Sequence, residues 1–268
     1  MEPVIISIEG NIGIGKTTLC KKLKEHNFTV CEEPIKNWLE TCDKNGKNIL
    51  DYFYEDIKKY GFMFQCNAFL TKALKLIETI KSVGNKNNLI FVERCVFTDY
   101  KCFARNLYKT GEMEEIEWKV YKKFFKYIIS KTPPKCPLPN GYIYLRSENN
   151  KILIDRIAKR GRESEKSIPV SYLDSLNVFH DKWLNKKDKN ILIIDCSEEE
   201  TDEYWNDIIE KIVNWTNNLE IKEKYNIERK TEKKLWDIYI IIGFIIFGWF
   251  LYLISKTSEN FSEDTISL

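Results

Sequence analysis

Residues 10–17, GNIGIGKT, have the spacing of a phosphate-binding loop, G-x-x-x-x-G-K-[ST]. The glycines of such a loop let successive backbone N–H groups curl around a β-phosphate, and the helix that follows adds partial positive charge. Lys16 is expected to reach the β- and γ-phosphate oxygens, and the Thr17 hydroxyl is expected to bind Mg²⁺. The sequence therefore predicts an ATP-binding loop formed by Gly10, Asn11, Ile12, Gly13, Ile14, Gly15, Lys16, Thr17 and Thr18.

A second segment with catalytic potential is CEEPIKNW, residues 31–38. Its acidic residues come at the end of a predicted strand, because Pro34 cannot continue the strand ladder. In a doubly wound sheet, ligands bind beyond the carboxyl ends of the strands. A carboxylate at this point could accept the proton of a hydroxyl group that attacks the γ-phosphate. The residues alone do not separate this role from that of a solvated strand end.

The segment FVERCVFTDY, residues 91–100, brings two more charged side chains to a predicted strand end. Glu93 could complete the ligation of Mg²⁺, and Arg94 could hold the oxygens of a transferred phosphoryl group bidentately. A surface ion pair is the alternative interpretation of the same two residues.

Four basic residues fall within DRIAKRGRESE, residues 155–165. Arg156 and Arg160 share one helix face, and Gly161 offers a flexible break before Arg162. One interpretation is a lid whose arginines close over the phosphoryl group and exclude water. The other interpretation is a solvated basic helix face.

These segments need a scaffold that brings strand ends together. Short runs rich in isoleucine and valine alternate with longer segments of helical periodicity, which predicts a parallel sheet in an α/β fold with helices on both faces. The predicted strands are 4–8, 28–32, 88–93, 141–146 and 190–195. The predicted helices are 16–26, 49–83, 97–130, 148–160 and 170–186, and the proline-rich segment 131–141 is predicted to be a loop.

The composition agrees with one α/β domain and an appendage. The chain has 268 residues, of which 43% are hydrophobic, and a formal net charge of only +2. This charge gives no reason to expect a nucleic-acid partner, and none is predicted. The eight cysteines include no C-x-x-C pair and there are only two histidines, so we expect reduced thiols rather than a zinc site.

The C-terminal part of the chain has a different composition. Residues 238–254 carry no charge and would span about 25 Å as a helix, at roughly 1.5 Å per residue. With its flanking residues the run approaches the ~30 Å of a bilayer core, and aromatic residues lie towards its ends. A buried core helix is the alternative, but the run shows no polar face. The sequence therefore predicts a single-pass transmembrane helix at 235–255.

The segments beside this span predict its orientation. The preceding segment is rich in lysine, which by the positive-inside rule keeps the body of the protein on the cytosolic side of the membrane. The chain begins MEPVIISIEG, which lacks the features of a signal peptide. We therefore expect a membrane-anchored protein, held by its C-terminal tail, whose body faces the cytosol.

Four motifs together resemble the deoxynucleoside kinase family, which includes deoxycytidine, deoxyguanosine and mitochondrial thymidine kinases and the insect multisubstrate enzyme. They are GNIGIGKTT, EEPIKNW, ERCVFTDYKCFA and YLRSENNKILIDRIAKRGRESEKSIPVSYLDSLNVFHDKWL, within a resemblance that runs from about Ile5 to Cys196. It implies a P-loop kinase with a five-stranded parallel sheet and a helical lid. It also implies ATP- and Mg²⁺-dependent phosphorylation of the 5′-hydroxyl of deoxynucleosides, for nucleotide salvage and DNA precursor synthesis, by a homodimer.

With this resemblance the chain divides into four parts. The membrane anchor among them is not a family feature. The predicted parts are a deoxynucleoside kinase domain at 1–213, a charged linker at 214–234, the transmembrane tail anchor at 235–255 and a short tail at 256–268.

The resemblance implies roles at the end of the site where phosphate is transferred. Glu33 looks like the family's general base for the sugar 5′-hydroxyl, and Arg94 looks like the arginine near that hydroxyl. Glu93 looks like the acidic residue at Mg²⁺. The arginines similar to those of the family's lid are Arg156, Arg160 and Arg162.

The resemblance also implies roles around the nucleoside. Tyr54 and Glu165 match the pair that holds the 3′-hydroxyl, and Gln65 resembles the glutamine that contacts the base edge. The aromatic residues similar to those around the base are Trp38, Phe64 and Phe103. Cys95 stands where the family usually has serine, a small change beside Arg94.

Substrate preference depends on two further positions. Relatives that take deoxycytidine and purine deoxynucleosides have an arginine and an aspartate where this chain has Lys72 and Asp99, whereas thymidine-accepting relatives typically have uncharged residues there. A Lys–Asp pair leaves polar room for an exocyclic amino group and little for a thymine methyl. Deoxycytidine and purine deoxynucleosides are therefore expected over thymidine. An exposed helix lysine and a helix-capping aspartate are the alternatives.

Two other functions agree with part of the sequence. A nucleoside monophosphate kinase, such as a thymidylate kinase, shares the phosphate loop and a lid, but its phosphate acceptor calls for an extra arginine rather than a base. The second alternative is a membrane-tethered nucleotide-binding protein without catalytic activity, although every expected catalytic side chain is present.

Overall fold

One five-stranded sheet organises the part of the chain that the computed structural model describes, residues 3–84, 89–130, 136–162, 165, 168–188, 190–197 and 201–219. Its order is β2-β3-β1-β4-β5, and each neighbouring pair of strands is parallel, as predicted. The predicted strands are confirmed to within one residue at each end. They are β1 (Val4–Glu9), β2 (Thr29–Cys31), β3 (Leu89–Glu93), β4 (Gly141–Arg146) and β5 (Ile191–Asp195).

The central strand β1 is buried on both faces, as expected of a parallel sheet covered by helices. Ile6 and Ile8 are fully buried. Ile8 stands beside Glu93 of β3, and Glu9 stands beside Tyr144 of β4. The carboxyl ends of these three strands therefore lie at one edge of the sheet, where their following loops can meet.

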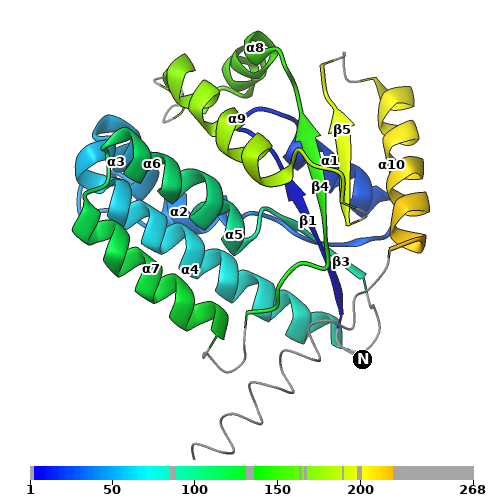
Figure 1. The fold of residues 1–268 in the computed structure, drawn as a ribbon, viewed down its shortest axis with the longest axis horizontal. Coiled ribbons are helices and arrows are strands. Elements are labelled where there is room, and N and C mark those ends of the chain that lie inside the picture. The colour runs from blue at the N-terminus through cyan, green and yellow to red at the C-terminus, as the bar shows by residue number, and fades with distance from the viewer. Residues whose placement is uncertain are drawn as a thin grey trace, which may run out of the picture. The chain divides into compact units, whose positions relative to one another are not determined.

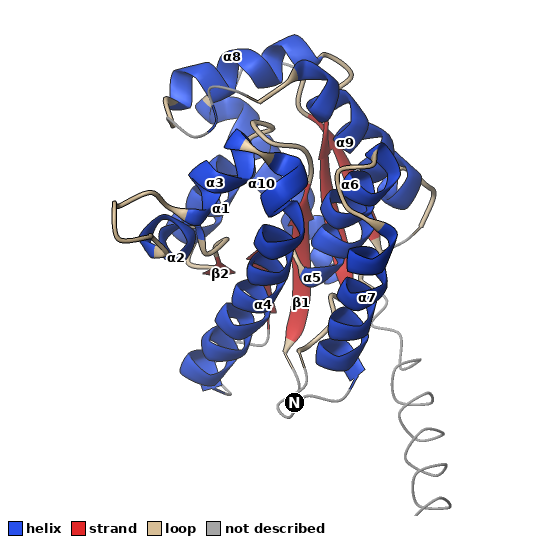
Figure 2. Ribbon diagram, turned by 90° about the vertical axis from the view of Figure 1, so that its left-hand side faces the viewer, coloured by secondary structure: helices blue, strands red, loops and turns tan. Residues whose placement is uncertain are grey.

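Helices cover both faces of the sheet, which gives three layers (Figure 1). On one face lie α1 (Lys16–Glu25) and α10 (Asp202–Asn217), and on the other lie α4 (Ile57–Val83), α6 (Ala104–Thr110) and α7 (Glu115–Ser130). Helix α8 (Asn150–Arg160) lies beyond the carboxyl ends of the strands, at the end of the sheet opposite the N-terminus (Figure 2). It is followed by α9 (Val170–Leu184).

The long predicted helices are broken by capping residues. Segment 49–83 forms α3 (Ile49–Glu55) and α4, because Asp56 ends the first helix and accepts a hydrogen bond from the Lys59 N–H at the start of the second. Gly111, at φ 82°, ends α6 and separates it from α7. The other elements of segment 97–130 are α5 (Val96–Thr98) and the π-helix η2 (Asp99–Phe103). The short helix α2 (Ile35–Glu40) and helix α10 lie outside the predicted helices.

Residues 220–268, which include the predicted membrane anchor at 235–255, lie outside the described residues. Among the residues that the structure does describe, no helix combines the length and the apolar character needed to cross a membrane. The anchor therefore stays a prediction from the sequence.

Candidate active site

Residues 10–15 join β1 to α1 through a loop that passes close to two other elements. At Gly10, which has φ +141°, a Cβ would come within 2.5 Å of the Leu145 carbonyl oxygen of β4. At Gly13, which has φ +79°, a Cβ would come within 2.7 Å of the Leu153 carbonyl oxygen of α8. Both positions require glycine, because a side chain would collide with backbone atoms. The loop is thus packed between the sheet and α8.

Lys16 is buried inside this loop. Its Nζ donates a hydrogen bond to the Asn11 carbonyl oxygen at 2.6 Å. Burial, helped by the nearby positive charge of Arg94, lowers the pKa of Lys16 from 10.5 to about 7. A phosphate group in the loop would stabilise the charged form of this lysine.

Thr17 and Glu93 lie side by side at the loop. Thr17 Oγ1 donates a hydrogen bond to Glu93 Oε1 at 2.7 Å. A hydroxyl and a carboxylate are oxygen ligands of the kind that Mg²⁺ prefers, and Mg²⁺ takes its remaining ligands from waters and substrate phosphates. The two side chains therefore fit the predicted Mg²⁺ site. Within the described part of the chain, no group of three or more histidine, cysteine or acidic residues offers another metal site.

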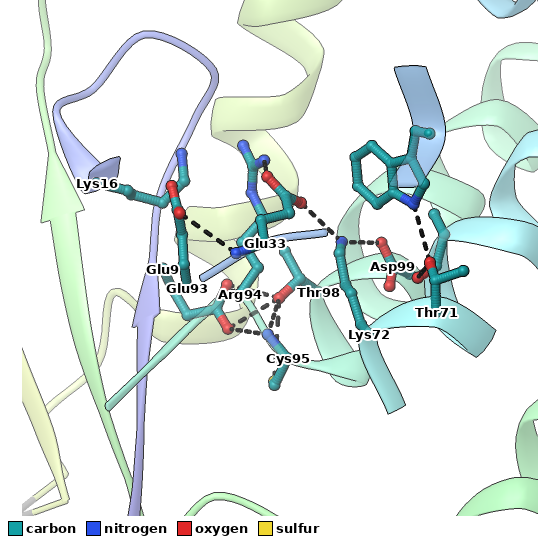
Figure 3. A network of polar contacts seen from close by, with 12 residues as sticks. Glu9, Lys16, Glu33, Thr71, Lys72, Glu93, Arg94, Cys95, Thr98 and Asp99 are labelled. Atoms are coloured by element: carbon teal, nitrogen blue, oxygen red, sulfur yellow. Dashed lines mark hydrogen bonds and ion pairs between the residues drawn. The ribbon is translucent and has the colours of Figure 1, made fainter. Parts of the chain in front are cut away.

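Glu33 follows β2, and its side chain is only 6% exposed, between two cations (Figure 3). Arg94 Nη1 donates to Glu33 Oε2 at 2.9 Å, and Lys72 Nζ lies 3.0 Å from Glu33 Oε1. Burial by itself would raise the pKa of this carboxyl group. The positive charges of Arg94, Lys72 and Lys16 together outweigh burial and lower the pKa from 4.5 to about 2. Glu33 is therefore ionised at neutral pH.

Arg94 has a backbone conformation that is uncommon for a residue with a side chain, with φ +57°. Its backbone N–H donates to the Ile8 carbonyl oxygen at 3.0 Å, and its Nη2 donates to the Gly10 carbonyl oxygen at 3.3 Å. Its guanidinium carbon lies 4.9 Å from the centre of the Phe103 ring. These contacts direct the guanidinium group from the end of β3 towards Glu33.

Lys72, from α4, bridges two carboxylates, because its Nζ also lies 2.7 Å from Asp99 Oδ1. Asp99 begins η2, and π-helical turns are frequent at functional sites. Burial raises the pKa of Asp99 to about 6, against the opposing effect of Lys72. Asp99 Oδ2 is buried and has no hydrogen-bond partner among the described residues.

Aromatic side chains and one amide line another part of the site. Trp38 and Phe64 are in edge-to-face contact with ring centres 5.3 Å apart, and Trp38 Nε1 donates to Thr71 Oγ1 at 2.9 Å. Gln65 is buried, and its Oε1 also lacks a hydrogen-bond partner within the described structure. Rings beside an unsatisfied amide suit a flat ligand with a polar edge.

The predicted lid arginines lie in the second half of α8 and just after it. Arg162 Nη1 lies 3.1 Å from Glu165 Oε1, and Arg160 forms an ion pair with the other oxygen of the same carboxylate. Arg156 Nη1 donates to the Cys196 carbonyl oxygen at 3.4 Å. The Glu165 carboxylate thus meets the lid arginines, and it lines the same cleft as Tyr54, its predicted partner at the sugar.

These side chains share one cleft of about 840 Å³. It is lined by every predicted site residue except Gly10 and Asn11. Ile152, Asp155 and Lys159 of α8 also line it and were not predicted. Ile152, Asp155 and Lys159 follow one another at spacings of three and four residues, and this helical spacing is the sequence signal that could have found them. The remaining unpredicted lining residues are Lys21, Ile35, Leu50, Phe53, Ala68 and Ser197.

Residues 6–217 match the family described as Deoxynucleoside kinase. The chain belongs to the deoxynucleoside kinase family. The match covers all of the sheet except the first two residues of β1, and it covers the phosphate loop and the whole cleft. The chain is therefore a transferase that phosphorylates deoxynucleosides, which disfavours both the monophosphate kinase and the inactive nucleotide-binding protein.

The kinase is similar to deoxycytidine kinases of several vertebrates. It is 37% identical to deoxycytidine kinase 1 of Xenopus laevis over 201 residues, which cover 68% of this chain and 74% of the relative. It is 32% identical to deoxycytidine kinase 2 of Gallus gallus over 220 residues, 72% of this chain and 82% of the relative. It is 31% identical to the deoxycytidine kinase of Homo sapiens over 240 residues, 80% of this chain and 91% of the relative.

Two buried polar side chains, those of Glu9 and Asn11, lie next to the cleft without lining it. Asn11 Nδ2 donates to the Leu173 carbonyl oxygen at 2.8 Å and to Asn177 Oδ1 at 2.6 Å, so its side chain ties the phosphate loop to α9. Glu9, directly before the loop, is fully buried and was not predicted. The sequence did carry a signal for Glu9. It is the acidic residue that ends a strand whose only other polar residue is Ser7, and a carboxylate buried in such a strand needs hydrogen-bond partners.

We expect the Glu33 cluster to make the kinase lose stability in acid. The folded-state pKa of Glu33 lies below 4.5, so its stabilising effect is complete above that pH and is lost as the pH falls towards 2. Glu33→Gln removes this titration. The free energy of unfolding of the variant, measured by urea denaturation between about pH 6 and pH 3, should therefore fall less steeply than that of the wild type.

The matched control is Glu32→Gln, because Glu32 is the neighbouring residue and its side chain is 42% exposed. This variant should keep the wild-type pH dependence. If Glu33→Gln and the wild type lose stability with the same slope, the ion pairs of Glu33 do not stabilise the fold.

Proposed function

We propose that the kinase transfers the γ-phosphate of ATP to the 5′-hydroxyl of a deoxynucleoside. The observation that carries this proposal is the buried, ionised carboxylate of Glu33 in the same cleft as the phosphate loop. A hydroxyl group can donate a hydrogen bond to such a carboxylate, whereas the phosphate of a monophosphate acceptor would be repelled by it. The acceptor is therefore a neutral hydroxyl.

In the proposed step, the 5′-oxygen forms a bond to the γ-phosphorus while the bond from that phosphorus to the β,γ-bridging oxygen breaks. The hydroxyl proton passes to a Glu33 oxygen, and ADP leaves. Phosphoryl transfer proceeds through a loose transition state, in which the protein contributes mainly by positioning and by stabilising charge. By accepting the hydrogen bond of the hydroxyl, Glu33 also orients the 5′-oxygen towards the γ-phosphorus.

The cations around the phosphate loop supply the complementary charge. Lys16 would hold β- and γ-phosphate oxygens, and Thr17 and Glu93 would hold Mg²⁺, which neutralises negative charge on the phosphates when bound. Arg160 and Arg162 carry guanidinium forks that match phosphoryl oxygens bidentately. Both line the cleft, where their closure over the phosphates would also exclude water.

Two orphaned acceptors support a preference for bases with an exocyclic amino group. Asp99 Oδ2 and Gln65 Oε1 are buried in the cleft without a donor, and leaving such atoms unpaired is costly. The amino groups of cytosine and adenine supply N–H donors where thymine presents a carbonyl beside its methyl group, and guanine carries its amino group at another ring position. We therefore propose deoxycytidine and the purine deoxynucleosides as substrates favoured over thymidine, with Phe64 and Phe103 against the base.

A substrate panel tests this function. With ATP and Mg²⁺, the purified kinase should phosphorylate deoxycytidine, deoxyadenosine and deoxyguanosine with higher kcat/KM than thymidine, and it should not phosphorylate dCMP or dTMP. Glu33→Gln should lower kcat by about 100-fold or more and leave ATP binding intact. Glu32→Gln serves again as the control. Turnover of dCMP, or unchanged turnover in Glu33→Gln, would overturn the assignment.

An exposed apolar face on two helices supports a homodimer. On α4, Met63, Leu70 and Leu74 recur at helical spacing and are 43–50% exposed. On α7, which lies beside α4, Phe124 and Tyr127 are exposed by 50% and 58% (Figure 1). Apolar side chains gathered on one face of a protein are typical of interaction sites, and a two-fold dimer would cover the same face on both copies.

We expect Leu74→Glu to convert the dimer into monomers, because a carboxylate would be buried against the partner's apolar face. Sedimentation equilibrium of the two proteins measures the change in mass. Val178→Glu, at a 48% exposed position on α9, is the control and should leave the mass of the assembly unchanged. A wild-type kinase that sediments as a monomer would contradict the dimer.

We also propose that residues 235–255 anchor the kinase to a membrane, with the kinase domain on the cytosolic side. The support is the uncharged run of this segment and the lysine-rich flank before it. In a cell extract, the full chain should sediment with membranes, whereas residues 1–234 should stay in the supernatant with unchanged kcat. If the truncated chain still sediments with membranes or loses its fold, the segment is not an anchor.

A further inference from the structure

Glu9 ends β1 with a fully buried carboxylate that is not part of the cleft wall. Its Oε1 accepts hydrogen bonds from Ser7 Oγ at 2.6 Å and from the Cys95 N–H at 3.2 Å. Thr98 Oγ1 donates to the same carboxylate, at 2.8 Å from Oε1 and 2.7 Å from Oε2. Because a buried carboxylate is tolerated only when it is well paired, the function of Glu9 lies in the groups that it holds.

Two of those groups belong to the turn that follows Arg94 (Figure 3). The Cys95 N–H is the first backbone donor after Arg94, and it also lies 3.1 Å from Thr98 Oγ1. The Thr98 N–H donates to the Cys95 carbonyl oxygen at 2.9 Å and closes the turn. Glu9 therefore binds both ends of this turn and fastens it to the central strand.

The turn needs such a support because Arg94 has φ +57°, a conformation that a non-glycine residue keeps only where its surroundings impose it. Three consecutive residues impose it here. Ile8 accepts the N–H of Arg94, Glu9 accepts the N–H of the next residue, and Gly10 accepts a guanidinium N–H at 3.3 Å. The guanidinium group is thereby directed to Glu33.

We propose that Glu9 is a positioning residue for phosphoryl transfer, whose hydrogen bonds hold the Arg94 turn so that the guanidinium group meets Glu33 in the cleft. This inference rests on the roles that the proposed function gives to Arg94 and Glu33. Glu9 touches no substrate and acts through Arg94.

Acceptor oxygens, rather than a negative charge, are what this arrangement requires. Burial raises the pKa of Glu9, although the hydrogen bonds of Ser7 and Thr98 and the charge of Arg94 oppose the shift. The donors include one backbone N–H, two hydroxyl groups and the Cys95 thiol, and a neutral glutamine of the same shape can satisfy them with its amide oxygen and by rotation of the hydroxyls.

The experiment compares Glu9→Leu with Glu9→Gln in the full chain. Glu9→Leu removes every acceptor at nearly constant volume, and kcat should fall about 10- to 100-fold because Arg94 is no longer held in place. The KM for ATP should change by less than about twofold, since Lys16 and Thr17 stay in position. Glu9→Gln should restore kcat to within about threefold of the wild type.

Thr98→Val is a second variant for the case in which Glu9→Leu does not fold. It removes the Thr98 hydroxyl and leaves the Cys95 N–H bonded to Glu9, so kcat should fall as well, but by less than in Glu9→Leu. Tyr144→Phe is the control, because Tyr144 stands beside Glu9 in the sheet and the variant loses one part-buried hydrogen bond, to Asp181 at 2.8 Å, rather than a bond to the Arg94 turn. Its kcat should stay within about twofold of the wild type.

Three results would overturn the inference. The first is that folded Glu9→Leu or Thr98→Val keeps the wild-type kcat. The second is that Tyr144→Phe loses kcat as strongly as they do, which shows a general effect of sheet stability. The third is that Glu9→Gln is as impaired as Glu9→Leu, which shows that charge is needed instead. A wild-type chain that fails to phosphorylate deoxynucleosides would instead disprove the proposed function.

Discussion

The burial of the Glu33 carboxylate is the physical constraint on which the rest of the site depends. Removing a carboxylate from water costs several kcal/mol unless cations and hydrogen bonds compensate for it. Arg94 and Lys72 provide this compensation, at 2.9 and 3.0 Å. Each cation is held by a further partner, the Gly10 carbonyl oxygen for Arg94 and the Asp99 carboxylate for Lys72. Glu33 is thereby coupled through its two cations to the phosphate loop and to η2.

The parallel sheet explains how residues far apart in sequence reach this cluster. The phosphate loop, Glu33 and Arg94 follow β1, β2 and β3, which are neighbours in the order β2-β3-β1. Because all strands run in the same direction, their carboxyl ends meet at one edge, and ligands of such sheets bind there. Helix α4 and the π-helix η2 then add Lys72 and Asp99 to the same cluster.

Several features of the fold and site could be predicted because they depend on local chemistry. Apolar runs located the five strands, and the glycine-lysine pattern located the phosphate loop. Helix breaks were harder, since Asp56 and Gly111 end helices through a cap and a positive φ that sequence periodicity does not reveal. The ion pair of Glu165 with the lid arginines was missed for a different reason, because it depends on how α8 and the segment after it approach each other in space.

The sequence by itself determined the elements, the phosphate loop and the types of side chain at the strand ends, because these follow from spacing, turn chemistry and burial patterns along the chain. Apart from the Lys72–Asp99 pair, which the family resemblance implied, only the tertiary structure decided how the charges are paired. Lys72 bridges Glu33 and Asp99, and Glu9 holds the Arg94 turn, because packing brings α4, η2 and three strands to one buried point. Buried charges must find partners within a few ångströms, and no sequence separation specifies those distances.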